Sequence, residues 1–278
     1  MRILVARRPR VELATAALGL AVVALYAPVL HALVAVWAGI PYYSYGFLVP
    51  IFSVYLAWDA RRQLASRPSA PSRLGLGILA AGFGVLAAGM LAGSLTVQTL
   101  SLPIVMTGAL VLTIGPPRTR VLAFPLAFLA FMAPLPEPVL PALSLPLQQV
   151  ATVVGEWMLW LVGVPVTREG LFLALPSVTL HITEACNGLR FLLAMIVVGV
   201  AFAGTMQTGW RRGVLVVGGA VAVALVANWL RVAGTGMMAE LYGREAAEGL
   251  THVVWGKIVY GAMLVPFALL VLALRRRP

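Results

Sequence analysis

The chain has 278 residues, of which 61% are hydrophobic and only 10% are charged, and its mean hydropathy is +0.97. A soluble domain carries about 25% charged residues, so this composition excludes a water-soluble surface. The chain is therefore expected to be embedded in membrane lipid. The net charge of +11 would suit a nucleic-acid-binding protein, but most of the 20 Lys and Arg gather in short clusters between or beyond apolar runs. That placement is typical of cytoplasmic loops, so no nucleic-acid partner is expected.

Five basic clusters fix the predicted topology, because each marks a cytoplasmic end of an apolar run. These clusters are Arg2, Arg7, Arg8 and Arg10; Arg61, Arg62, Arg67 and Arg73; Arg118 and Arg120; Arg211 and Arg212; and Arg275, Arg276 and Arg277. The first apolar run lacks a clear small-residue cleavage site, so it is expected to remain as a helix. Five spans are predicted before residue 134, at 12–37, 47–58, 74–95, 100–114 and 121–133.

The segment 134–184 is rich in proline and acidic residues and differs from the rest of the chain. Its apolar run at 147–164 would break the alternation of basic loops if it crossed the membrane, so we predict an interfacial or re-entrant helix there. Alternating residues at 166–182 predict a small extracytoplasmic hairpin. Spans at 189–206, 214–237 and 252–274 follow.

The predicted fold is thus an all-α integral membrane protein with about eight transmembrane helices, one interfacial or re-entrant helix and a small extracytoplasmic hairpin. It is expected to form a single polytopic membrane domain over 1–278, with an extracytoplasmic insertion at about 134–185 and both termini in the cytoplasm.

Cys186 is the only cysteine, and it lies where an extramembrane loop enters a predicted helix, in the stretch Thr-Glu-Ala-Cys-Asn-Gly-Leu-Arg at 183–190. The positive end of a helix dipole and nearby arginines favour the thiolate, which is the reactive form of cysteine. The alternative is that the thiol packs as a small hydrophobic group. The polar neighbours Glu184, Asn187 and Arg190 favour a functional site with these three in supporting roles.

Two further ionisable residues are predicted at the same membrane depth as Cys186. Arg231 lies three residues after Asn228, so the two share a helix face, and the amide favours a polar site over an arginine that snorkels to the headgroups. His252 lies where the chain re-enters the membrane, although a lone histidine there is more often structural. Ionisable residues inside a membrane segment are costly and are therefore functional candidates.

These three side chains predict nucleophilic catalysis. A thiolate attacks a peptide carbonyl to form a thioester, and histidine deprotonates the thiol or protonates the leaving amine. Arginine stabilises the oxyanion, because it stays charged and offers directed donors. A metal site is not expected, because one cysteine and three scattered histidines lack ligand spacing.

The sequence resembles the exosortase/archaeosortase family of membrane transpeptidases, and the likeness covers most of the chain after about residue 43. Glu-Ala-Cys-Asn-Gly-Leu-Arg at 184–190 resembles the cysteine motif of the family, with Asn187 where serine is more common. Tyr45 is a second departure, since the family has histidine in a Tyr-Ser-His-Gly pattern. The other matching stretches are Asn-Trp-Leu-Arg at 228–231, His-Val-Val-Trp-Gly at 252–256, Phe-Pro-Leu at 124–126, Met-Ala-Pro-Leu-Pro at 132–136, Gly-Val-Pro-Val at 163–166 and Glu-Gly at 169–170.

The resemblance implies a multi-pass protein of the bacterial inner (cytoplasmic) membrane whose active site lies at the outer face. Such enzymes cut C-terminal sorting tails of exported proteins, usually a Pro-Glu-Pro motif (PEP-CTERM) followed by an apolar helix and basic residues, and transfer the protein to a lipid-linked or polysaccharide-linked acceptor. No cofactor is implied. Two alternatives stay open: an intramembrane hydrolase without transfer, and a transporter or structural component of exopolysaccharide export.

Overall fold

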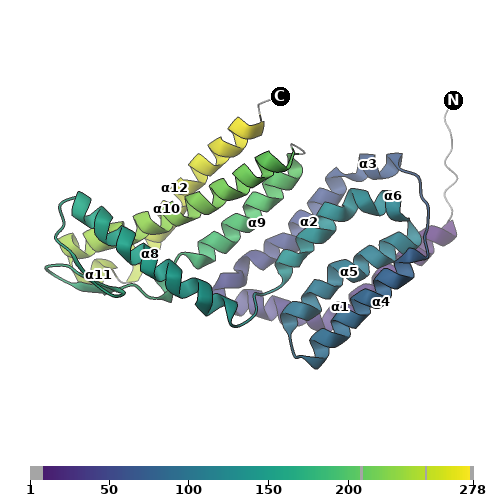
Figure 1. The fold of residues 1–278 in the computed structure, drawn as a ribbon, viewed down its shortest axis with the longest axis horizontal. Coiled ribbons are helices and arrows are strands. Elements are labelled where there is room, and N and C mark those ends of the chain that lie inside the picture. The colour runs from purple at the N-terminus through teal and green to yellow at the C-terminus, as the bar shows by residue number, and fades with distance from the viewer. Residues whose placement is uncertain (1–8, 207–208, 248, 276–278) are drawn as a thin grey trace. The chain divides into compact units, whose positions relative to one another are not determined.

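The computed structural model describes residues 9–206, 209–247 and 249–275 (Figure 1). The chain divides into two compact units, Met1–Pro136 and Glu137–Pro278. The single domain expected over 1–278 therefore stays a prediction. The terminal arginines Arg2, Arg7, Arg8, Arg276 and Arg277 lie outside the described residues, and the cytoplasmic location of both termini likewise stays a prediction.

The regular elements in the described part of unit 1 are all helices, joined by short loops. Its elements are α1 (Pro9–Gly39), η1 (Pro41–Phe47), α2 (Leu48–Asp59), α3 (Arg61–Ser66), α4 (Leu74–Leu91), α5 (Leu95–Thr113), α6 (Pro116–Thr119), η2 (Arg120–Leu122), α7 (Ala123–Phe128) and η3 (Leu129–Met132). The predicted span at 100–114 begins five residues earlier, at Leu95, because the Ser94 side chain caps the helix by accepting from the Val97 amide. The preceding helix correspondingly ends at Leu91.

Hydrogen bonds between distant elements hold unit 1 together. The Tyr26 and Ser101 hydroxyls lie 2.6 Å apart, and the Trp37 indole donates to the Met132 carbonyl oxygen at 3.2 Å. Tyr45, the position that departs from the family pattern, is buried in η1. Burial, reinforced by the neighbouring Tyr43, raises the pKa of Tyr45 to about 12, so its phenol is neutral at physiological pH.

Unit 2 contains four longer helices and a small sheet. Its elements are α8 (Val139–Leu161), β1 (Thr167–Glu169), β2 (Phe172–Ala174), β3 (Thr179–His181), η4 (Glu184–Cys186), α9 (Leu189–Thr205), α10 (Trp210–Tyr242), α11 (Arg244–Ala247) and α12 (Gly249–Arg275). Helix α10 contacts α8, α9 and α12, so it is the scaffold of this unit. In Figure 1 these helices run from teal (α8) to yellow (α12).

The all-α membrane fold is confirmed, but a count of eight spans is not. In the described part of the chain, six helices are long and apolar enough to cross a membrane: 17–39, 74–91, 95–113, 184–205, 210–242 and 249–275. The predicted span at 47–58 forms α2, which also has 12 residues, and the predicted span at 121–133 forms the broken series η2, α7 and η3, so neither is among the six. Helix α8 is not among the six, and it begins at Val139, ahead of the 147–164 predicted for an interfacial helix.

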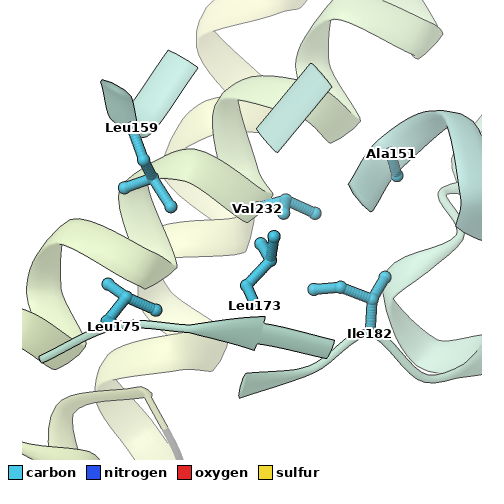
Figure 2. Close-up of a cluster of buried hydrophobic side chains, with 6 residues drawn as sticks. All are labelled: Ala151, Leu159, Leu173, Leu175, Ile182 and Val232. Atoms are coloured by element: carbon cyan, nitrogen blue, oxygen red, sulfur yellow. The ribbon is translucent and has the colours of Figure 1, made fainter. Parts of the chain in front are cut away.

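The predicted hairpin at 166–182 is a three-stranded antiparallel sheet with the order β1-β2-β3. Its inner face carries Leu173, Leu175 and Ile182, which pack against α8 and α10 in a buried apolar cluster (Figure 2). The helical residues of this cluster are Ala151, Leu159 and Val232. Such burial contributes about 25 cal/mol per Å² of apolar area, so the short sheet is fixed by its packing against two helices.

Candidate active site

Cys186 lies in a tight turn that joins β3 to α9. The Cys186 amide donates to the Thr183 carbonyl oxygen at 2.8 Å, which forms the 3₁₀ turn η4. The Asn187 side chain then stabilises the turn on both sides: its Oδ1 accepts from the Leu189 amide at 2.8 Å, and its Nδ2 donates to Ser144 Oγ of α8 at 2.7 Å. The polar residue after the cysteine therefore anchors the cysteine turn to a neighbouring helix.

Gly188 makes the turn sterically possible. Its φ of +72° lies in the left-handed region, which side-chain-bearing residues adopt at a cost. A Cβ at this position would also lie 2.5 Å from Asn228 Cγ, so the backbone of the turn approaches α10 too closely for any side chain. That approach allows Asn228 Nδ2 to donate to the Cys186 carbonyl oxygen at 2.9 Å.

Replacing Gly188 by alanine is therefore expected to destabilise unit 2 and displace the cysteine turn. Gly163→Ala is the matched control, because Gly163 has a φ of +81° but no atom within 4 Å of an added Cβ. The overpacking at residue 188 adds about 1–3 kcal/mol beyond the backbone strain that both variants share. Thermal unfolding of the purified protein in detergent measures the difference. Equal loss of stability in the two variants would show that the contact with Asn228 is not tight.

Arg231 is buried in the same region, with only 7% of its surface exposed. One terminal nitrogen, NH2, donates to the Ala185 carbonyl oxygen at 2.8 Å, and the other, NH1, lies 3.4 Å from His252 Nε2. Its Nε is buried without a hydrogen-bond partner, and no carboxylate in the described part of the chain forms an ion pair with it. An unsatisfied buried donor costs about 1–3 kcal/mol, and this burial argues against the snorkelling alternative.

His252 lies between Arg231 and Thr235 on the facing side of α12. A guanidinium can only donate hydrogen bonds, so His252 Nε2 must be the acceptor in its contact with Arg231. The ring proton is then on Nδ1, which lies 3.4 Å from Thr235 Oγ1 and donates to it. Both contacts are thus compatible with a neutral imidazole whose proton is on Nδ1.

Tyr260 completes the cluster, and the sequence analysis missed it. Its hydroxyl donates to Asn228 Oδ1 at 3.3 Å, and its ring stacks on Phe191 with centroids 4.2 Å apart. The Arg231 guanidinium carbon lies 5.7 Å from the centre of the Tyr260 ring, within the range of a cation–π contact. The available signal was spacing: residues 252, 256 and 260 of α12 are four apart and share the face that meets Arg231.

The three predicted catalytic residues line one cavity of about 460 Å³. Besides Cys186, Arg231 and His252, its walls come from β3 and its flanks, from α10 and from the region between α10 and α12. The other lining residues are Val178, Thr179, Leu180, His181, Ile182, Thr183, Ala185, Val232, Thr235, Arg244 and Gly249. The Cys186 thiol forms no hydrogen bond with Arg231 or His252 within the described ranges, so the three groups share a cavity without a resting hydrogen-bonded triad.

The predicted supporting residues divide into two pairs. Asn187 and Asn228 are buried and position the cysteine turn, as described above. Glu184 and Arg190 are exposed and do not line the cavity. His181, which is not among the predicted site residues, does line it and stacks on Phe172 with centroids 4.4 Å apart.

Ser144, Gln148 and Thr235 form polar contacts that the sequence did not single out. Gln148 Nε2 donates to Ser144 Oγ at 2.9 Å, so α8 presents a small buried polar cluster to Asn187. In the described ranges, no three His, Cys, Asp or Glu side chains are placed to hold a metal ion. The predictions that neither a metal nor a cofactor is required stay predictions.

Comparison with known proteins shows to which family the chain belongs. The family model for transmembrane exosortases (Exosortase_EpsH) matches residues 37–269, which is most of the chain and includes every residue of the site described above. No curated protein and no solved structure shows significant similarity to the chain. The match covers most of the chain and includes the cysteine, arginine and histidine motifs. The chain therefore belongs to the transmembrane exosortase family.

Proposed function

We propose that this chain is a cysteine transpeptidase that cleaves the C-terminal sorting tails of exported proteins and transfers the cleaved protein to a surface acceptor. Family membership supports a membrane transpeptidase role in general terms. The observation that carries the proposal is the cavity in which Cys186, Arg231 and His252 lie together, with a buried guanidinium that has no carboxylate partner in the described residues.

The first step of the proposed reaction forms a thioester. The Cys186 sulfur attacks a peptide carbonyl carbon of the tail, and its proton moves to the neutral His252 ring. The carbon–nitrogen bond then breaks, and the leaving amine takes that proton from His252. The Nε2 lone pair faces Arg231 in the resting arrangement, so His252 must turn toward the thiol when substrate enters. That turn would also release the contact of 3.4 Å between His252 Nδ1 and Thr235 Oγ1.

Arg231 would stabilise the oxyanion that develops on the attacked carbonyl. The guanidinium carries five N–H donors, and the contacts to Ala185 and His252 use two of them. Its contact with the Ala185 carbonyl oxygen ties the guanidinium to the residue before the nucleophile, so donor and nucleophile keep a fixed separation. Fixed donors stabilise a transition state without reorganisation, which is why such contacts contribute strongly to rate.

The second step resolves the thioester. A nucleophilic amine or hydroxyl of a lipid-linked or polysaccharide-linked acceptor attacks the thioester carbon, transfers its proton to His252 and releases the Cys186 thiolate. Water in the same role would give hydrolysis. We place the reaction at the outer face of the bacterial cytoplasmic membrane, where a tail anchored in the same bilayer would present its motif to the cavity.

The proposal is tested by producing the chain together with an exported reporter that ends in a Pro-Glu-Pro motif, an apolar helix and basic residues. We expect a shorter reporter, cut next to the motif, whose mass shows the new C-terminus. A C-terminus joined to an acceptor supports transfer, and a free carboxylate supports the hydrolase alternative. A reporter that keeps its tail at full expression of the chain would overturn the proposed function.

A further inference from the structure

We infer that the free edge of β3 binds the substrate tail as an added β-strand and leads it to Cys186. This inference rests on the proposed function and specifies how its substrate is held. The occupant is the extended peptide around the cleavage site, because that edge forms a wall of the cavity that contains the nucleophile. Extended peptides commonly bind by adding a strand to an exposed sheet edge.

The register of the sheet shows which backbone groups of β3 are available. β3 is the last strand in the order β1-β2-β3, with no strand beyond it in the described part of the chain. The Leu175 amide donates to the Val178 carbonyl oxygen, and the Ile182 amide to that of Leu171, both at 2.9 Å. Hydrogen-bonded pairs alternate along an antiparallel ladder, so residues 178, 180 and 182 point their backbone groups toward β2. The N–H and C=O groups of Thr179 and His181 therefore point to the free edge.

The residues that line the cavity place that edge next to the active site. Six consecutive residues, 178–183, line it, whereas no residue of β1 or β2 does. Successive side chains of a strand point to opposite faces, so a cavity on one face would be lined by alternate residues only. Lining by every residue of β3 and its flanks indicates that the cavity runs along the edge of the strand.

The buried face of the sheet and the short chain between β3 and Cys186 also favour a tail bound along the edge of β3. The inner face of the sheet is occupied by its packing on α8 and α10 (Figure 2). Cys186 packs against that same cluster. Only the four residues 182–185 separate His181 from Cys186, which ends η4. A peptide paired with Thr179 and His181 would therefore continue toward the thiol within a few residues.

Main-chain pairing has a consequence for specificity. Hydrogen bonds to Thr179 and His181 would recognise the backbone of the tail, whatever its side chains, and alternate side chains of the tail would face the cavity walls. Thr179 and His181 are both exposed and lie two residues apart, so they would face tail residues that are also two apart.

Disulfide mapping tests this pairing. Cys186→Ala removes the only cysteine, and either Thr179→Cys or His181→Cys is then added. Each variant is produced with a series of reporters that carry one cysteine at successive tail positions. Paired residues have Cβ atoms about 4.5–5.5 Å apart, close enough for a disulfide after small adjustments. We expect the preferred tail position to differ by two residues between the two variants, with weak linkage at the position between, and the sign of the shift gives the strand direction.

Arg168→Cys is the matched control, because Arg168 is exposed on β1 at the other edge of the sheet. It should give no preferred tail position. The inference would be overturned if disulfides formed equally at adjacent tail positions, without a two-residue step. It would also be overturned if residue 168 formed disulfides more strongly than residues 179 and 181. Tail cleavage by the parent chain is measured separately. If the parent chain cleaves the tail but the linkage shows no two-residue step, only strand addition is rejected. If the linkage shows the two-residue step but the parent chain does not cleave the tail, only the proposed reaction is rejected.

Discussion

The Cys186→Ala variant is expected to lose processing of a tail-bearing reporter completely while still inserting into the membrane. No other thiol exists in the chain, so no second group can form the thioester. Removing the nucleophile of an enzyme that works through a covalent intermediate costs on the order of 10⁶-fold in rate. Electrophoresis of the co-expressed reporter measures the loss, and membrane fractionation measures insertion.

Cys186→Ser refines the same experiment. Serine keeps the size and the turn geometry of cysteine, but its hydroxyl is a far weaker nucleophile near neutral pH, so this variant should also be severely impaired. The thermal stability of both variants should stay close to that of the parent, because the thiol forms no hydrogen bond with its catalytic partners in the described residues. Normal processing by Cys186→Ala would reject the assignment of Cys186 as nucleophile.

Arg231→Lys is expected to reduce processing about a hundredfold although it preserves the positive charge. The guanidinium reaches the Ala185 carbonyl oxygen and His252 Nε2 from two different nitrogens, and the compact lysine ammonium cannot reproduce that fork. Loss of one oxyanion donor costs roughly 3 kcal/mol, which corresponds to about a hundredfold in rate. The rate of reporter cleavage at equal expression is the measurement.

Arg168→Lys serves as the matched control for this substitution. Arg168 forms a part-exposed ion pair with Glu156 at 3.1 Å, and exposed pairs of this kind contribute at most about 1 kcal/mol. This control should cleave at the rate of the parent. If Arg231→Lys also cleaved within a fewfold of the parent, an oxyanion role for Arg231 would be wrong.

Composition and the order of basic clusters determined the membrane fold, because a chain with so few charges has no alternative to lipid contact. Local motifs also identified Cys186, Arg231 and His252, since polar residues that interrupt apolar helices stand out against their neighbours. Spacing gave part of the site as well, because Asn228 and Arg231 lie on one face of α10. Local patterns left the number of spans open: segment 47–58 forms the 12-residue helix α2, whereas segment 121–133 is broken into several short helical elements.

Only the tertiary structure decided which residues meet across elements. Ser144 belongs to α8 and Tyr260 to α12, yet they contact Asn187 and Asn228 through side-chain hydrogen bonds. Neither contact has a local signature, because a serine or a tyrosine in an apolar helix is common and its partner is set by how helices pack. The position of β3 beside the cavity has the same origin. Strand pairing follows from alternation along the chain, but β3 lines the same cavity as Cys186 because the apolar inner face of the sheet is buried against α8 and α10.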